Sequence, residues 1–77
     1  MFNHLTNIVE HNGKKYYVST NDTFDHGLET MIFKVNKQID DEYDINWAGL
    51  YVELYSSAEK AIERHNYICS HISEIID

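Results

Sequence analysis

The sequence has one cysteine, no hydrophobic run longer than a few residues, and few basic residues. A lone cysteine, Cys69, cannot form a disulfide within the chain, and the first residues lack the charged, then apolar order of a signal peptide. A membrane-spanning helix needs about 18 to 20 apolar residues in succession. We therefore expect a cytoplasmic protein that does not cross a membrane.

Acidic residues outnumber basic ones by 13 to six, and the formal net charge is −7. The excess is uneven: residues 1–37 are balanced, residues 38–57 carry −5 and residues 58–77 carry −2. An acidic domain repels the phosphate backbone, so direct binding of nucleic acid is not expected, whereas a basic groove on another protein would attract it. The alternative interpretation is a solvated acidic loop that only aids solubility.

The length of 77 residues suits one domain, 1–77, with a modest core. A domain of this size buries only about 60% of the surface that its unfolded chain exposes, so a homodimer contact or a bound partner would add useful stability. The hydrophobic content of 43% is too high for a disordered chain. The chain is therefore expected to fold as a single unit.

The strongest local signal is the pair Asn12-Gly13, because both residue types tolerate the positive φ angles that a tight type I′ turn needs. The flanking residues are rich in strand formers, so they predict a hairpin. Two later segments alternate hydrophobic and polar residues with the period of a strand. The sequence thus predicts strands at residues 5–10, 15–20, 29–35 and 46–55.

Two connections are expected between the later strands. The first is marked by the turn-forming residues Asn21, Asp22, Asp25 and Gly27. The second, residues 36–45, contains the acidic run and has neither helical nor strand periodicity. We expect this second segment to form an exposed connection.

Ser56 stands three residues before Glu59, which is the spacing of a capping box that begins a helix. Apolar residues then recur at steps of three and four, so the helix should pack one face on the sheet. The chain has no room for the crossover helices of a parallel sheet. The predicted fold class is α+β, a small antiparallel sheet of about four strands packed against one C-terminal amphipathic helix. The apolar stripe consists of Ala58, Ala61, Ile62, His65, Ile68, Cys69, Ile72, Ile75 and Ile76.

Along residues 46–55, aliphatic side chains alternate with aromatic and polar ones. We expect the helix to cover the aliphatic face, which carries Leu50, Val52 and Leu54. The opposite face would then expose aromatic side chains, which typically mark a protein interface. A purely structural homodimer contact and the absence of any role are the alternatives. The aromatic residues in question are Tyr17, Trp47, Tyr51 and Tyr55.

The sequence offers no complete constellation for catalysis, such as a nucleophile beside a base or a glycine-rich phosphate loop. His65 and Cys69 have the i, i+4 spacing of two metal ligands, but a second pair is missing, and a buried histidine and thiol are the alternative. The acidic run lacks the glycine and the distant glutamate of an EF-hand loop. We expect no enzymatic activity, no cofactor and no bound metal.

Two segments resemble a pattern in small proteins encoded by phages and prophages of Gram-positive bacteria. Residues 23–33 contain the strand pattern Glu-Thr-Met-hydrophobic-Phe, and residues 55–65 contain Tyr-Ser-Ser-x-Glu-x-Ala-x-x-x-His. A tryptophan-containing strand lies between them, as in the family. The resemblance implies a phage accessory protein acting in the cytoplasm of the host cell, a class that often inhibits host defence by stoichiometric binding. It implies no catalytic residue.

Together these observations lead to the hypothesis of a phage-encoded inhibitor of a bacterial defence protein, such as a CRISPR nuclease with a basic channel. The acidic run would speed the encounter, and aromatic anchors would supply desolvated contact. The alternative is a homo-oligomeric protein that sequesters an anionic ligand, such as a nucleotide second messenger, through Lys14, Lys15, Lys34 or Arg64 across a subunit interface. The predicted partner-binding residues are Asp40, Asp41, Glu42, Asp44, Glu53, Trp47, Tyr51 and Tyr55.

Overall fold

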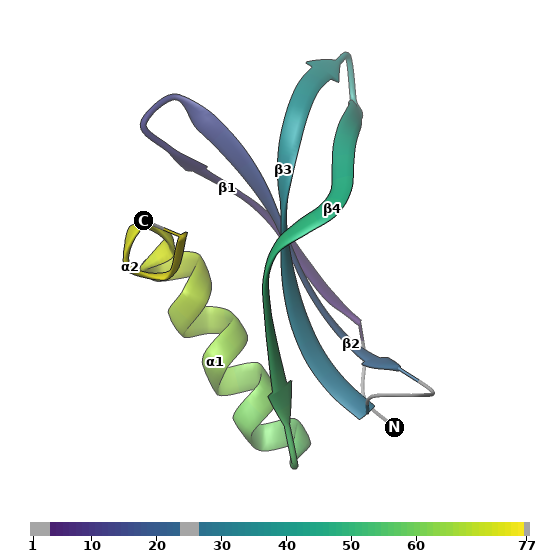
Figure 1. Ribbon diagram of the computed structural model, residues 1–77, viewed down its shortest axis with the longest axis vertical. Helices are drawn as coiled ribbons and strands as arrows, with labels where there is room; N and C mark the ends of the chain where they lie inside the picture. Colours follow the sequence, from purple (N-terminus) through teal and green to yellow (C-terminus); the bar gives the residue numbers. More distant parts are fainter. Residues whose placement is uncertain (1–3, 24–26, 77) are drawn as a thin grey trace.

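The computed structural model describes residues 4–23 and 27–76 as an antiparallel four-stranded sheet with helices on one of its faces (Figure 1). Sequence neighbours are neighbours in the sheet, whose strand order is β1-β2-β3-β4. The α+β fold class predicted from the sequence is confirmed. In chain order the elements are β1 (Leu5–His11), β2 (Lys14–Thr23), β3 (Gly27–Ile39), β4 (Glu42–Tyr55), α1 (Ala58–Ser70) and α2 (Ile72–Ile76).

The first hairpin forms as predicted, because its turn residues can adopt the required backbone angles. Asn12 has φ 53° and Gly13 has φ 75°, and positive values at both positions define the turn that matches the twist of the flanking strands. The register pairs His11 with Lys14 and continues to Leu5 opposite Thr20. Local turn chemistry therefore sets the pairing of β1 with β2.

The two expected connections are largely strand, so the prediction of irregular loops was wrong, although residues 36–44 are exposed as expected. β2 includes Asn21 and Asp22, Gly27 begins β3, and Asp25 lies outside the described residues. The acidic segment forms the end of the β3–β4 hairpin, with its turn at Asp40 and Asp41. Hydrophobic periodicity could not reveal it, because side chains 36–44 are exposed on both faces, whereas backbone pairing alone maintains the ladder.

The helix begins one residue later than the capping box predicts. Ser57, not Ser56, is the N-cap, and its hydroxyl accepts a hydrogen bond from the backbone N–H of Lys60 at 3.2 Å. α1 ends at Ser70, where His71 forms the C-cap and separates the short α2 from it. The expected single helix is thus two helical segments. No helix in the described part of the chain has the length and hydrophobicity of a membrane span.

The hydrophobic core lies between the helices and the face of the sheet opposite to the one predicted. Val18, Ile32 and Ile68 are fully buried there and pack in one cluster with Tyr16 and Ile72. The face of Leu50, Val52 and Leu54, expected beneath the helix, is exposed. The prediction of which face the helix covers was therefore wrong.

A bulge in β4 separates residues that strict alternation would place on one face. Between the pairs Ile32–Tyr51 and Lys34–Asn46, β3 advances by two residues and β4 by five. The odd difference reverses the alternation, so Tyr51 packs against the core while Trp47 lies on the other side. Gly49 has φ 74° within this bulge, a conformation that favours glycine.

Replacing Gly49 with alanine should destabilise the fold by about 1–2 kcal/mol, because an L-residue is strained at this positive φ. The added Cβ would also lie 3.2 Å from Met31 Cε. Urea unfolding followed by circular dichroism measures the change. The neighbouring substitution Ala48→Ser, at an exposed site, is the control and should cost less than about 0.5 kcal/mol. Equal midpoints for G49A and the parent protein would contradict this account of the bulge.

Candidate functional site

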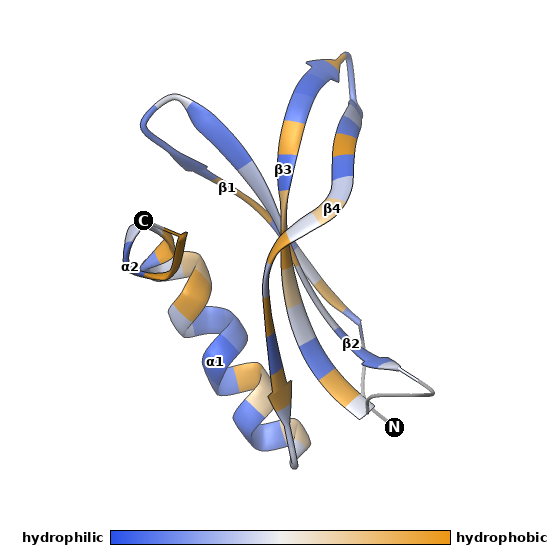
Figure 2. Ribbon diagram, in the orientation of Figure 1, coloured by the Kyte–Doolittle hydropathy of each residue, from blue (hydrophilic) through white to orange (hydrophobic). Residues whose placement is uncertain are grey.

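The most unusual surface is the side of the sheet away from α1, which we call the open face. Along β4 the exposed fractions are 66% for Trp47, 54% for Leu50, 54% for Val52 and 58% for Leu54. In Figure 2 the half of β4 beside α1 carries several hydrophobic segments. Exposure of neighbouring large apolar side chains on a small domain marks an interaction surface. Met31 on β3 lies opposite Val52 and continues this surface.

An aromatic cluster anchors one end of the open face. The Trp47 ring meets Phe33 edge-on at 5.0 Å between centroids and Tyr17 edge-on at 6.0 Å. Tyr17 and Phe33, which are cross-strand partners, stack at 6.2 Å. These distances and angles are those of favourable aromatic pairs. Phe33 is 8% exposed although no helix covers it, so Trp47 is held in place by a partly buried base.

The acidic run lies at the end of the β3–β4 hairpin, which extends beyond the helices (Figure 1). We call Asp40, Asp41, Glu42 and Asp44 the acidic tip. All four residues are exposed. Trp47 follows three residues after Asp44 on the same strand, so the acidic tip and the aromatic cluster are neighbours along β4. The structure thus brings four of the eight predicted partner-binding residues to the end of the hairpin and places Trp47 farther along the same strand, over Phe33 and Tyr17.

The other three, Tyr51, Glu53 and Tyr55, lie on the helix-covered face and cannot join that surface. Arg64 of α1 donates two hydrogen bonds to Glu53, Nε to Oε1 at 2.7 Å and Nη2 to Oε2 at 3.0 Å. The Tyr51 hydroxyl donates to Oε2 of the same carboxylate. Hydrogen bonds from Arg64 lower the pKa of Glu53 to about 2, despite partial burial. This cluster joins β4 to α1, and its role is structural.

A buried chain of hydrogen bonds runs beneath α1 through His65, which is 1% exposed. The Tyr55 hydroxyl donates to Thr30 Oγ1 at 2.9 Å, and the Thr30 and Thr20 hydroxyls are hydrogen-bonded to each other. Thr20 Oγ1 lies 2.6 Å from His65 Nδ1, and His65 Nε2 lies 2.7 Å from Asn7 Oδ1. A neutral ring that carries its proton on Nε2 lets each hydroxyl donate to the next acceptor. The sequence predicted that His65 lies on the buried stripe of the helix, but it did not predict these hydrogen bonds.

Stability should fall as the pH is lowered from about 7.5 to 5, because burial, and secondarily the charge of His4, lowers the pKa of His65. The unfolded histidine titrates near its ordinary value of about 6.5. Below that pH the unfolded chain takes up a proton that the folded chain does not, which favours unfolding. Urea unfolding at several pH values measures the slope. His65→Gln should flatten it, and an unchanged slope in that variant would assign the effect to other groups.

His65 and Cys69 of α1, whose spacing suggested a pair of metal ligands, are both at least partly buried. Cys69 is partly buried, and burial raises the pKa of its thiol, which disfavours the reactive thiolate. Both ring nitrogens of His65 have hydrogen-bond partners. Within residues 4–23 and 27–76, no group of three or more His, Cys, Asp or Glu side chains could hold a metal ion.

Sequence reasoning missed the aliphatic part of the open face. A strand that alternates aliphatic and aromatic residues does not tell which set faces a helix, since both suit a core. The available signal was Gly49, because an isolated glycine within a strand often marks a bulge. A bulge there would have separated Trp47 from Tyr51.

Comparison of the chain with protein-family models, with curated proteins and with solved structures finds no match.

Proposed function

We propose that the chain is a non-catalytic binding protein, encoded by a phage, that inhibits a bacterial defence protein by occupying it stoichiometrically. The observation that carries the proposal is the open face, where Trp47, Leu50, Val52 and Leu54 are each more than half exposed. Trp47 is the natural anchor, because tryptophan supplies a large contact area at low cost in rotamer entropy. The resemblance to small phage proteins supports the biological context.

The partner should present a basic groove beside an apolar strip, as at the mouth of a nucleic-acid channel. The acidic tip carries four carboxylates at the exposed end of a hairpin, and such a cluster attracts a basic groove over a distance and speeds association. β4 is an edge strand, so its free side can also add to a sheet of the partner. A defence nuclease, with a CRISPR nuclease as the specific case, supplies the basic groove, because it holds nucleic acid in a positively charged channel.

The test is a phage infection assay in a set of bacterial strains that each carry one defence nuclease, and one of these nucleases is a CRISPR nuclease. Each strain is infected with and without expression of this protein. Inhibition should raise plaque formation by at least an order of magnitude for one system, and the purified nuclease should bind the chain in a fixed ratio. The double variant Trp47→Ser, Leu54→Ser should weaken that binding at least tenfold, as expected for interface anchors. Charge reversal of Asp41 and Glu42 to lysine should slow association.

Two matched controls separate binding from folding. Ile62→Ser removes an apolar side chain of similar exposure, 45%, from α1, and Tyr55→Phe alters the helix-covered face. Both should leave inhibition unchanged apart from a modest loss of stability. Binding that survives both the W47S/L54S change and the charge reversal would refute the proposed surface. Sedimentation of the chain alone as a stable dimer that buries Trp47 would assign the open face to a second copy.

A further inference from the structure

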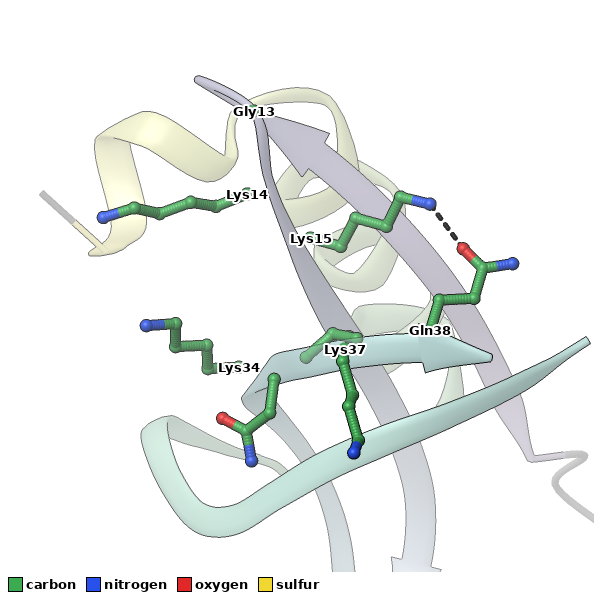
Figure 3. Close-up of a pocket in the computed structure, with 8 residues that line it drawn as sticks. Gly13, Lys14, Lys15, Lys34, Lys37 and Gln38 are labelled. Carbon is green, nitrogen blue, oxygen red and sulfur yellow. Dashed lines mark hydrogen bonds between the residues drawn. The ribbon is translucent and has the colours of Figure 1, made fainter. Parts of the chain in front are cut away.

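A pocket of about 300 Å³ lies where β2 begins and β3 approaches its end. Four of the six basic residues of this acidic chain line it. Figure 3 shows the lysine side chains extending from the two strands, with Gly13 of the first hairpin turn at one border. The lysines are Lys14, Lys15, Lys34 and Lys37.

Two of the four lysines have compensating neighbours. Lys15 Nζ donates a hydrogen bond to Gln38 Oε1 at 2.6 Å and lies 6.0 Å from the centre of the Tyr43 ring. Lys15 is also the cross-strand partner of Glu10, and Lys37 is the partner of Asp44. Opposite charges on directly paired strand positions stabilise one another. These two lysines are therefore partly engaged within the chain.

The side chains of the other two, Lys14 and Lys34, are exposed and have no hydrogen bond or ion pair with any residue that the structure describes. They lie on the same side of the sheet, because Lys34 pairs with Tyr16 and side chains two residues apart along a strand share a face. In Figure 3 both side chains extend in the same direction from neighbouring strands. The two ammonium groups repel each other and face solvent together.

The overall negative charge does not cancel this local positive field. Asp44 is the member of the acidic tip nearest to Lys34 along the ladder, because it pairs with Lys37, three residues or about 10 Å along the strand from Lys34. The Debye length at physiological ionic strength is about 8 Å, so Asp44 is partly screened from Lys34, and the turn at Asp40, about 20 Å away, is largely screened. An anion between Lys14 and Lys34 therefore experiences two nearby cations and more distant carboxylates, of which Asp44 already pairs with a lysine.

We propose that this lysine pocket binds a small phosphate-bearing anion, held between the ammonium groups of Lys14 and Lys34. Charge-assisted hydrogen bonds from lysine to phosphate oxygens are among the stronger contacts in water. The volume is at the lower end of the range for ligand pockets, which suits a phosphate, a pyrophosphate or a mononucleotide. The site is separate from the open face and goes beyond the proposed function.

The pocket belongs to one chain, whereas the sequence led us to expect basic residues from two subunits around such a ligand. Lys14 and Lys34 extend in the same direction within a single copy (Figure 3), and Lys15 and Lys37 line the same pocket. Arg64 does not contribute, because it is bound to Glu53 on the helix-covered face. Oligomerisation is therefore not required for the anion to bind.

The test is a titration of the full chain, labelled with ¹⁵N, with sodium pyrophosphate at constant ionic strength. Saturable shifts should centre on the backbone amides of Gly13, Lys14 and Lys34 and fit one site per chain. Lys14→Gln and Lys34→Gln should each weaken binding by about tenfold, the effect of losing one charge-assisted contact. A parallel titration with AMP identifies the source: tighter binding than pyrophosphate assigns the site to a nucleotide, and equal or weaker binding assigns it to the phosphate group.

Lys60→Gln is the matched control. It makes the same change in net charge on α1, where Lys60 pairs with Glu63 at 3.6 Å, and it should alter the affinity by less than about twofold. An equal loss in K60Q would show that only the net charge matters and would refute the site. Shifts that do not saturate, or that spread evenly over the surface lysines, would also refute it. Binding of a single-stranded oligonucleotide without binding of pyrophosphate or AMP would exclude a small-anion site.

Discussion

Replacing Ile32 with alanine should destabilise the protein by about 2–5 kcal/mol, the range for truncating a buried aliphatic side chain. Ile32 is 0% exposed and packs with Val18 and Ile68 between the sheet and α1. A domain of this size has only a few kcal/mol of net stability, so I32A should be largely unfolded at 37 °C. The milder Ile32→Val should cost about 0.5–1.5 kcal/mol and remain folded enough for measurement.

Leu54→Ala is the matched control for this prediction, because it truncates an aliphatic side chain on the opposite face. Leu54 is 58% exposed, so its truncation should change the free energy of unfolding by less than about 1 kcal/mol. Urea unfolding measured by circular dichroism gives both values. A larger loss for L54A than for I32V would mean that the helix covers the open face after all, and the proposed interface would be lost with it.

Replacing Thr20 with valine should destabilise the protein by about 2–4 kcal/mol, although the two side chains have nearly the same shape. Thr20 is 0% exposed and its hydroxyl links Thr30 to His65 Nδ1. Valine would leave the Thr30 hydroxyl and the ring nitrogen buried without that partner, at about 1–3 kcal/mol for each unsatisfied group.

Thr6→Val on the edge strand β1 is the corresponding control, since Thr6 is exposed and the same atoms are exchanged. It should shift the free energy of unfolding by less than about 0.5 kcal/mol. NMR of the His65 ring adds a second readout, because loss of the Thr20 donor should change the Nδ1 signal in T20V and leave it unchanged in T6V. Equal stability of T20V and T6V would show that the chain of hydrogen bonds contributes nothing measurable.

The strands and the helix could be predicted because their signals are local. Asn12 and Gly13 set the first turn through their own backbone preferences, and the apolar stripe from Ala61 to Ile72 needs only the period of a helix. The end of the β3–β4 hairpin could not be predicted in this way. Its strands are held by backbone pairing while their side chains around Asp40 and Asp41 remain exposed, so no alternation marks them.

The candidate site was predicted in part. The acidic tip and Trp47 are exposed, as expected, and Glu42, Asp44 and Trp47 lie on one strand. Glu53 was grouped with the acidic tip because of its charge, but the structure pairs it with Arg64, eleven residues away in α1. A sequence shows that both charges are present, and only the packing of the helix on β4 brings them to 2.7 Å.

The amino-acid sequence by itself determined the fold class, the first hairpin and the amphipathic helix, because these depend on contacts between residues that are near one another in the chain. The tertiary structure alone decided which face of the sheet the helix covers. The physical reason is that β4 carries apolar side chains on both faces, and that the bulge at Gly49, where β4 has three more residues than β3, reverses its alternation, so that Trp47 lies on the open face and Tyr51 beneath the helix. The tertiary structure also decided that four lysines from two strands line one pocket. The spacing of residues within one strand does not determine its register with the neighbouring strand.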